Sequence, residues 1–349
     1  MIAIRPDRPH RFAAPLGGHA RALALLACCA LAACATGPGS RERDAVILYP
    51  GFAAAADVDG APPVADVTGR VVDAPDEAAA ELADTRWRNL EQSLGLFDVD
   101  ECERCPVEAR GPAGDVDRAM TDGEGYFDAT LDVAGLAPGW RTVRAASGEA
   151  SGTGELLVVP AADRLGIVSD VDDTVLVSEV SDKVRLLANT FLKNPLQREA
   201  VPGVAALYRR ALAANPEPGS AAMFYLSASP NELAGPITEL LDANGFPKGV
   251  LLTKRLTADR ARDPLLDQLA YKVARLESVF RALPHVGFVL VGDDVEDDPE
   301  AYETMRERHP ERVRAIWIRR VRGADEVRLP AGQVGLEDAL EGRAPIPGA

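Results

Sequence analysis

The sequence predicts an α/β fold in which a parallel sheet follows a smaller, mostly β region. After residue 160, apolar runs suited to buried strands alternate with stretches of helical periodicity, a pattern typical of crossover helices on a parallel sheet. Residues 107–160 instead hold short apolar runs separated by turn residues, which indicates a small β-sandwich-like domain. At 349 residues and 47% hydrophobic content, the chain can build more than one core.

Five segments are expected along the chain. They are a signal peptide (1–33), a tether (34–44), the mostly β domain (45–160), the parallel-sheet domain (161–328) and a loose tail rich in Gly and Pro (329–349). The expected strands of the parallel sheet are Leu165–Ser169, Ala222–Leu226, Val250–Thr253, Val286–Val291 and Val313–Ile318. The expected helices are Ala78–Leu96, Val204–Ala214, Pro236–Ala243 and Tyr271–Leu283.

The N-terminus has the layout of a secretory signal, in which arginines precede an apolar run at residues 22–33. That run is too short to span a bilayer. It ends in Leu31-Ala32-Ala33-Cys34, which resembles the lipobox of bacterial lipoproteins, where cleavage before the Cys is followed by its acylation. An ordinary signal ending in Ala-x-Ala is the alternative. We expect an exported protein, anchored by lipid at Cys34 to a bacterial membrane and facing the periplasm.

The net charge of −16 disfavours nucleic acid as a partner, because phosphate backbones are held by clustered Lys and Arg. One arginine-rich stretch could still attract an anionic headgroup, although solvated helix and strand faces explain it as well. It comprises Arg306, Arg308, Arg312, Arg314, Arg319, Arg320 and Arg322. Protein partners are not readable from the sequence.

Cys102 and Cys105 form the C-x-x-C pair that follows the signal. An oxidising periplasm favours a disulfide between them. A zinc site would need two further ligands, and the four His residues supply no matching spacing.

Carboxylates follow the first expected strand of the parallel sheet, in the run Asp170-Val171-Asp172-Asp173-Thr174. Parallel α/β sheets bind ligands at the carboxyl ends of their strands. A phosphatase that works through an aspartyl phosphate needs one carboxylate to attack phosphorus and a second to protonate the leaving oxygen. Asp170 and Asp172 suit these two tasks.

Two further groups suited to phosphate chemistry follow along the chain. Ser227 ends the second strand and could hold a phosphoryl oxygen, and Lys272 could neutralise charge on the transferring group. The fourth strand runs into a carboxylate cluster at residues 293–298, and such hard oxygen ligands predict Mg²⁺. For Asp173 or Asp294 alone, helix N-capping is the simpler explanation.

The motif order D-x-D-x-T, Ser, Lys and G-D-D-x-x-D-D resembles the haloacid dehalogenase superfamily of phosphatases. Four shorter motifs are similar to those of the actin-patch phosphatidate phosphatase family and its bacterial relatives. They are Ser169–Thr174, Phe224–Pro230, Gly245–Pro247 and Asp298-Pro299-Glu300. The resemblance implies a Rossmann-like sheet of the haloacid dehalogenase type. The short spacing between motifs leaves room only for a minimal cap.

The resemblance also implies roles for the motif residues. Asp170 would be nucleophile and metal ligand, and Asp172 would be the acid and base, with its backbone carbonyl on the metal. Ser227 and Lys272 would bind phosphate, and Asp293 would complete the magnesium site. The magnesium site would also have an outer carboxylate, for which there are two candidates. The motif spacing of the superfamily indicates Asp297, whereas the Asp-Pro-Glu sequence of the family indicates Asp298. Tyr271 stands where the family usually has His, and Thr253–Leu256 replace its Leu-Arg-Asp stretch.

The function expected from these residues is that of a Mg²⁺-dependent phosphatase acting on phosphatidate or a related lipid phosphate. The alternatives are a phosphatase or phosphotransferase for soluble or protein-bound phosphate, and a non-enzymatic surface lipoprotein whose carboxylates hold a cation. A protein that only binds a cation has no need of Asp172 beside Asp170.

Overall fold

The computed structural model describes residues 44–55, 62–73, 101–172, 174–175, 200–255, 268–322 and 329–347. These residues belong to one unit, Arg43–Ala349. The signal peptide, the tether residues before 44, Cys34, the expected helix at 78–96 and Asp173 lie outside the described residues.

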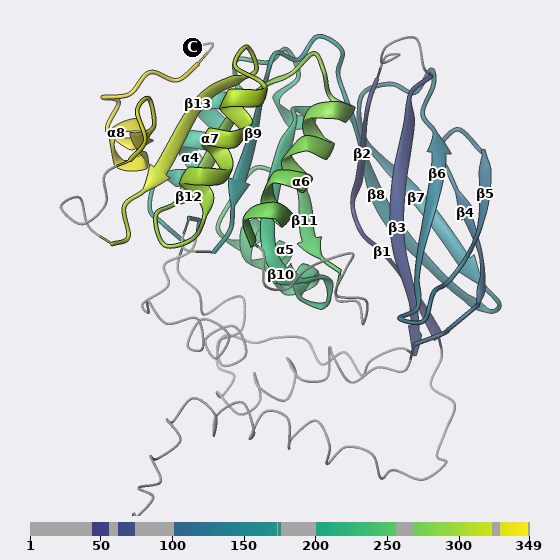
Figure 1. The fold of residues 1–349 in the computed structure, drawn as a ribbon. Helices are drawn as coiled ribbons and strands as arrows, with labels where there is room; N and C mark the ends of the chain where they lie inside the picture. Colours follow the sequence, from purple (N-terminus) through teal and green to yellow (C-terminus); the bar gives the residue numbers. More distant parts are fainter. Residues whose placement is uncertain are drawn as a thin grey trace, which may run out of the picture. The chain divides into compact units, whose positions relative to one another are not determined.

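The N-terminal part forms an eight-stranded mixed sheet (Figure 1). Its strands are β1 (Asp44–Leu48), β2 (Gly51–Ala54), β3 (Val64–Asp73), β4 (Pro106–Arg110), β5 (Val116–Met120), β6 (Tyr126–Asp132), β7 (Gly139–Ser147) and β8 (Ala150–Val159). They follow the order β1-β3-β2-β8-β7-β4-β5, and β6 pairs with β3. Burial alternates along β6, so one side of this strand packs on a core that includes Phe127 and Leu131.

The second sheet has six strands, and every neighbouring pair in it is parallel. Its strands are β9 (Leu165–Asp170), β10 (Met223–Pro230), β11 (Val250–Lys254), β12 (Gly287–Asp293), β13 (Val313–Arg319) and β14 (Val334–Gly335), in the order β11-β10-β9-β12-β13-β14. Every residue of β9 and β12 is buried, as expected for strands covered on both faces. The predicted α/β fold with a parallel sheet is confirmed.

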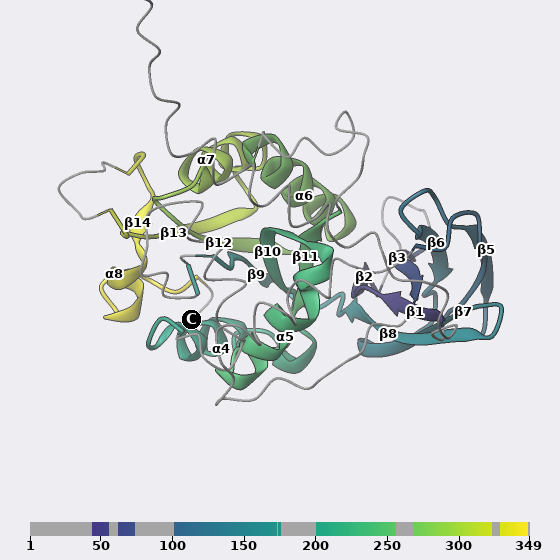
Figure 2. The same cartoon turned by 90° about the horizontal axis from the view of Figure 1, so that it is seen from below.

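Helices cover both faces of the parallel sheet (Figure 2). One core holds the apolar sides of α4 (Val204–Leu212) and α5 (Ala234–Ala243), and the other holds those of α6 (Gln268–Ala282) and α7 (Asp298–Arg308). The chain runs outward from β9 to β11 and then returns to β12 on the other side of β9. This reversal is a topological switch point, where α/β sheets form a crevice for ligands.

The prediction of a loose tail is wrong for residues 334–344. There β14 pairs with β13, and α8 (Leu336–Leu340) follows it. Leu336, Ala339 and Ala344 are buried in the same core as α4. The Gly and Pro content suggested a tail, but a few apolar side chains are enough to dock a short segment on an exposed sheet edge.

Two turns in the eight-stranded sheet are fixed by local contacts. Cys102 and Cys105 form the expected disulfide. Oδ1 of Asp122 accepts hydrogen bonds from the backbone N–H groups of Glu124 and Tyr126, as expected of an Asp in a turn. This turn joins β5 to β6, which pair with β4 and β3 rather than with each other. None of the described helices is long and apolar enough to cross a membrane.

Candidate active site

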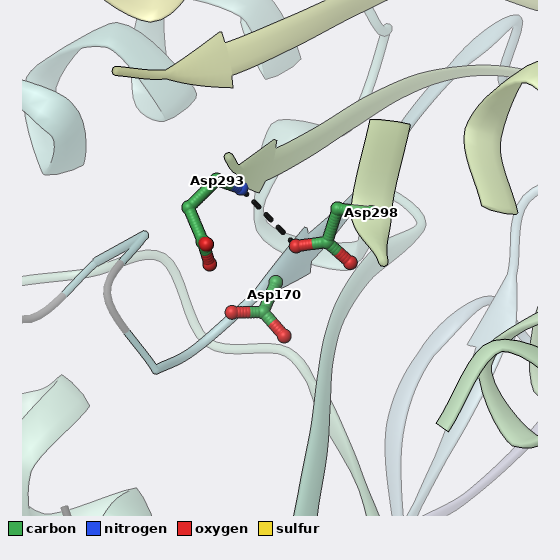
Figure 3. Close-up of side chains that lie close together, drawn as sticks. All are labelled: Asp170, Asp293 and Asp298. Carbon is green, nitrogen blue, oxygen red and sulfur yellow. Dashed lines mark hydrogen bonds between the residues drawn. The ribbon is translucent and has the colours of Figure 1, made fainter. Parts of the chain in front are cut away.

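Three buried carboxylates meet at the carboxyl ends of β9 and β12 (Figure 3). Asp170 is the last residue of β9, Asp293 the last of β12, and Asp298 the first of α7. One oxygen from each lies within 4.8 Å of the others. Oδ2 of Asp298 accepts a hydrogen bond of 3.1 Å from the backbone N–H of Asp293, which joins the start of α7 to the end of β12.

Lys272 of α6 reaches the same cluster, and its side chain is fully buried. Its Nζ lies 2.9 Å from Oδ1 of Asp170 and 2.5 Å from Oδ1 of Asp298. It also lies 3.0 Å from Oε2 of Glu296. A buried ammonium with three carboxylate partners is held firmly, because each partner satisfies one of its donors.

Burial and mutual repulsion perturb the titration of these groups. Burial raises the pKa of Asp170 well above its usual range, an effect that Lys272 opposes and that Asp298 and Asp293 reinforce. Burial and the charge of Asp298 raise the pKa of Asp293 to about 8. Burial lowers the pKa of Lys272, but its carboxylate partners outweigh this and hold it well above the usual range. Strong perturbation in a cluster at a switch point is typical of functional sites.

The donor set of the cluster fits a hard divalent cation. Oδ2 of Asp170 is buried and has no hydrogen-bond partner among the described residues. Lys272 offers a single positive charge to four carboxylates, those of Asp170, Asp293, Glu296 and Asp298. An orphaned buried oxygen and an excess of negative charge are both relieved when carboxylate oxygens share a cation.

A second group of polar side chains surrounds Asp172. Oδ2 of Asp172 accepts hydrogen bonds from Oγ of Ser227 at 3.1 Å and from Oγ of Ser229 at 3.5 Å. The backbone N–H of Ser229 donates to Oγ of Ser227 at 3.0 Å. Tyr271, which stands at the family's His position, donates from its hydroxyl to the carbonyl of Ser227 at 3.4 Å. The structure therefore brings Ser227 to Asp172.

The structure distinguishes the two candidates for the outer carboxylate. Asp298 is buried against Asp293 and Lys272, whereas Asp297 is the exposed N-cap of α7. Gly292 makes this possible, because a Cβ at that position would collide with the side chain of Asp298. Of the two candidates, Asp298 is therefore the one that lies in the buried cluster.

Two residues of the cluster were not singled out from the sequence. Glu296 pairs with Lys272, and Oγ1 of Thr174 donates to Oδ2 of Asp293 at 3.4 Å. Thr174 belongs to the D-x-D-x-T motif and Glu296 to the G-D-D-x-x-D-D motif. Residue type alone does not indicate which side chains of a motif point into the cluster.

Several members of the arginine-rich stretch are engaged locally. Arg306 pairs with Glu303, and Arg308 pairs with Glu277. Arg312 donates to the backbone carbonyls of Phe280, Leu283 and Val286. These contacts favour a structural role over an anion-binding surface for these three residues.

Comparison with known proteins concerns the parallel-sheet domain. Residues 165–320 match the family model described as "Phosphatidate phosphatase APP1, catalytic domain". The predicted family resemblance is confirmed. Over 156 residues the chain is 28% identical to phosphatidate phosphatase APP1 of Saccharomyces cerevisiae, covering 44% of this chain and 26% of that protein. It is 30% identical over 165 residues to the uncharacterized protein C29B5.04c of Schizosaccharomyces pombe, covering 47% and 26%.

The chain therefore spans about a quarter of the length of these curated relatives. The APP1-like part, residues 165–320, contains Asp170, Asp172, Ser227, Lys272, Asp293 and Asp298, whereas the eight-stranded sheet lies outside it.

Two solved structures align only weakly. Amylomaltase from Corynebacterium glutamicum is 13% identical over 60% of this chain and 23% of that chain, with a TM-score of 0.14. Flavohemoglobin from Malassezia yamatoensis is 10% identical over 79% and 60%, with a TM-score of 0.17. Scores this low carry no argument about the fold.

Proposed function

We propose that this chain is a Mg²⁺-dependent phosphatase that hydrolyses a lipid phosphate, with phosphatidate as the first candidate substrate. The match of residues 165–320 to a phosphatidate phosphatase catalytic domain supports the reaction class. The observation that carries the proposal is the buried cluster of Asp170, Asp293 and Asp298 around Lys272. Its place at the switch point of a parallel sheet supports a Rossmann-like sheet of the haloacid dehalogenase type.

In the first half of the proposed reaction, a carboxylate oxygen of Asp170 attacks phosphorus. The new bond from oxygen to phosphorus forms as the bond to the leaving oxygen breaks, and Asp172 gives its proton to that oxygen. The hydroxyls of Ser227 and Ser229 donate to Asp172 and hold its carboxyl group in place. The products of this half are an alcohol, diacylglycerol for phosphatidate, and a phosphorylated Asp170.

In the second half, water attacks phosphorus, and Asp172 takes the proton that the water loses. The bond from Asp170 to phosphorus breaks, which releases inorganic phosphate and restores the carboxylate. Lys272 contacts Asp170, so its charge would lie close to the transferring group in both steps. Ser227 has a single hydroxyl proton, so to bind a phosphoryl oxygen its O–H would turn from Asp172 to that oxygen, and Ser229 would remain the donor to Asp172.

Asp170, Asp293 and the backbone carbonyl of Asp172 are the proposed ligands of Mg²⁺, and Asp298 supports them as the outer carboxylate. The backbone N–H groups of Val295 and Glu296 donate to Oδ1 of Asp293 and orient its carboxylate. Bound there, Mg²⁺ would neutralise charge on the cluster and on the phosphoryl oxygens.

The proposal also includes export and anchoring at Cys34, which the lipobox-like sequence supports. An anchored enzyme is held next to a membrane lipid, so location and substrate agree. Soluble or protein-bound phosphate is the competing substrate class.

The test is phosphate release by the full chain in detergent micelles, measured with phosphatidate and with p-nitrophenyl phosphate, with Mg²⁺ or with EDTA. We expect Mg²⁺-dependent release from phosphatidate that disappears in Asp170→Asn. Release only from the soluble ester would support the phosphatase reaction but would rule out phosphatidate as the substrate. If a folded protein that binds Mg²⁺ released phosphate from neither substrate, the result would favour the non-enzymatic alternative, a surface lipoprotein whose carboxylates hold a cation.

A further inference from the structure

Arg70 ties the eight-stranded sheet to residues 227–233, which span the end of β10 and the short helix after it and are called here the catalytic loop. This residue of β3 is only 6% exposed. Its Nη1 lies 2.8 Å from Oε1 of Glu232, its Nη2 lies 2.8 Å from Glu101, and its Nε donates to the carbonyl of Glu124. Glu232 lies in the short helix η3 (Asn231–Leu233), directly after β10. A buried guanidinium with three fixed acceptors makes a rigid connection.

Arg255 makes a second tie, from the end of β11. Its guanidinium pairs with Asp122 and, at 3.3 Å, with Asp128, both in the eight-stranded sheet domain. It also lies 4.3 Å from the ring centre of Tyr126, and Arg70 lies 5.0 Å from the same ring centre. The hydroxyl of Tyr126 lies 3.4 Å from Oε1 of Glu232. The four residues Arg70, Tyr126, Glu232 and Arg255 form one interdomain cluster, called here the clamp.

The clamp adjoins the residues proposed to hold Asp172. Glu232 is three residues beyond Ser229, whose hydroxyl and backbone N–H contact Asp172 and Ser227 respectively. Next to Glu232, Oδ1 of Asn231 accepts a hydrogen bond of 2.6 Å from Thr253 of β11. The catalytic loop is therefore fastened on one side to the eight-stranded sheet and on the other to β11.

We propose that the clamp positions the catalytic loop, so that the eight-stranded sheet is a working part of the catalytic site. Arg70, Tyr126, Glu232 and Arg255 act as positioning residues, because they reach the reaction only through Ser227, Ser229 and Asp172. The inference rests on the proposed function, since it assigns the sheet a role in that reaction. Displacing a catalytic group by about 1 Å costs roughly a hundredfold in rate, so a fixed loop has a direct kinetic value.

The chain supplies a matched control near the amino end of β11, the strand whose carboxyl end is followed by Arg255. Lys248 pairs with Glu155 of β8 at 2.6 Å, and its Nζ lies 4.5 Å from the ring centre of Trp140 of β7. This contact joins the same two sheets, but Lys248 precedes the amino end of β11, whereas the catalytic groups follow the carboxyl ends. A variant there tests domain contact without touching the catalytic loop.

The experiment compares Glu232→Ala, Glu232→Gln and Arg255→Gln with Lys248→Gln, after circular dichroism has established that each variant is folded. With p-nitrophenyl phosphate, we expect kcat to fall about 10- to 100-fold in Glu232→Ala and Arg255→Gln, with KM within about twofold of the parent value. Glu232→Gln keeps an acceptor for Arg70 and should recover most of the lost kcat. Lys248→Gln should keep the parent kcat. The side chain of Arg255 is partly exposed, so Arg255→Gln should perturb folding less than Glu232→Ala does. It replaces Glu232→Ala in the comparison if that variant does not fold.

Amide hydrogen exchange provides a readout that needs no activity. We expect faster exchange at residues 226–233 in Glu232→Ala and Arg255→Gln, and parent-like exchange there in Lys248→Gln. Folded clamp variants with the parent kcat, or an equal loss in Lys248→Gln, would overturn the inference. If the parent protein hydrolyses neither substrate, the proposed function fails, and exchange alone decides whether the clamp holds this loop.

Discussion

The ammonium nitrogen of Lys272 lies 2.9 Å from Oδ1 of Asp170, and the two side chains are 0% and 1% exposed. Removing the ammonium would leave Asp170 buried without a counter-charge, whereas Lys272 without Asp170 would still pair with Glu296 and Asp298. The pair thus links the stability of the parallel-sheet domain to the residue proposed as nucleophile.

The first prediction concerns that pair. Lys272→Met should lower the free energy of unfolding by about 3 to 5 kcal/mol, because it leaves buried carboxylates without their counter-charge. Urea unfolding in EDTA measures the loss. Lys248→Met is the control, since an exposed pair contributes about 1 kcal/mol or less. Equal, small losses in the two variants would show that Lys272 is not a buried counter-ion in solution.

Asp172→Asn separates the two halves of the proposed reaction. p-Nitrophenolate leaves without needing a proton, whereas the attack of water on phospho-Asp170 still needs a base. We expect a burst of p-nitrophenol followed by a steady rate that is lower by about 10²- to 10⁴-fold. Mass spectrometry of the quenched protein should find one phosphoryl group, and the Asp170→Asn variant should show neither burst nor adduct. Turnover without a burst would contradict the assignment of Asp172 as the base.

The pair Asp298→Asn and Asp297→Asn tests the outer carboxylate. Asp298 is buried in the cluster and Asp297 is exposed, so only the first substitution should weaken Mg²⁺ binding. We expect the Mg²⁺ concentration at half-maximal activity to rise at least about tenfold in Asp298→Asn and to stay near the parent value in Asp297→Asn. Thermal stabilisation by Mg²⁺ measures the same difference without substrate. The reverse order would return the role to Asp297.

Asp163 predicts a pH dependence of stability that is separate from the catalytic cluster. Neither carboxyl oxygen has a hydrogen-bond partner among the described residues, and the side chain is buried. Burial and the charge of Glu217 raise the pKa of Asp163 from 3.8 to about 7, although the charge of Arg164 acts in the opposite direction. The folded state therefore holds this proton more tightly than the unfolded state does, and stability falls as the pH rises from about 4 to about 7.

The measurement for Asp163 is the melting temperature of Asp163→Asn minus that of the parent protein between pH 5 and pH 8. We expect this difference to increase with pH, because only the parent must ionise a buried carboxyl group. Glu149→Gln, which removes an exposed carboxylate, should show no such trend. A flat difference for Asp163→Asn would mean that water or a cation satisfies this side chain.

Cys34 is predicted to carry the membrane anchor. Cys34→Ala should abolish incorporation of radiolabelled palmitate in a bacterial host and move the protein from the membrane pellet to the soluble fraction. Cys28→Ala and Cys29→Ala lie in the same apolar run and should leave both properties unchanged. Membrane retention of Cys34→Ala without label would argue for a different anchor.

Much of the parallel-sheet domain could be predicted because its strands are short, continuous apolar runs. The expected strands at 165–169, 250–253 and 313–318 each lie within an observed strand, and helix α5 ends beside Gly245, whose φ is +68°. The edge of the sheet was harder to predict. Strand β14 has two residues, and its place depends on docking against β13 rather than on any periodicity.

The sequence by itself determined which functional groups are available to the site. Residue types and their order after the strands specify its carboxylates, its hydroxyls and its lysine. Tertiary structure alone decided which of them meet. It turned Asp298 inward and Asp297 outward, brought Glu296 to Lys272, and joined Arg70 to Glu232 across 162 positions. These choices depend on how a helix start or a loop is rotated against its neighbours, and a contact between distant segments leaves no local pattern in the chain.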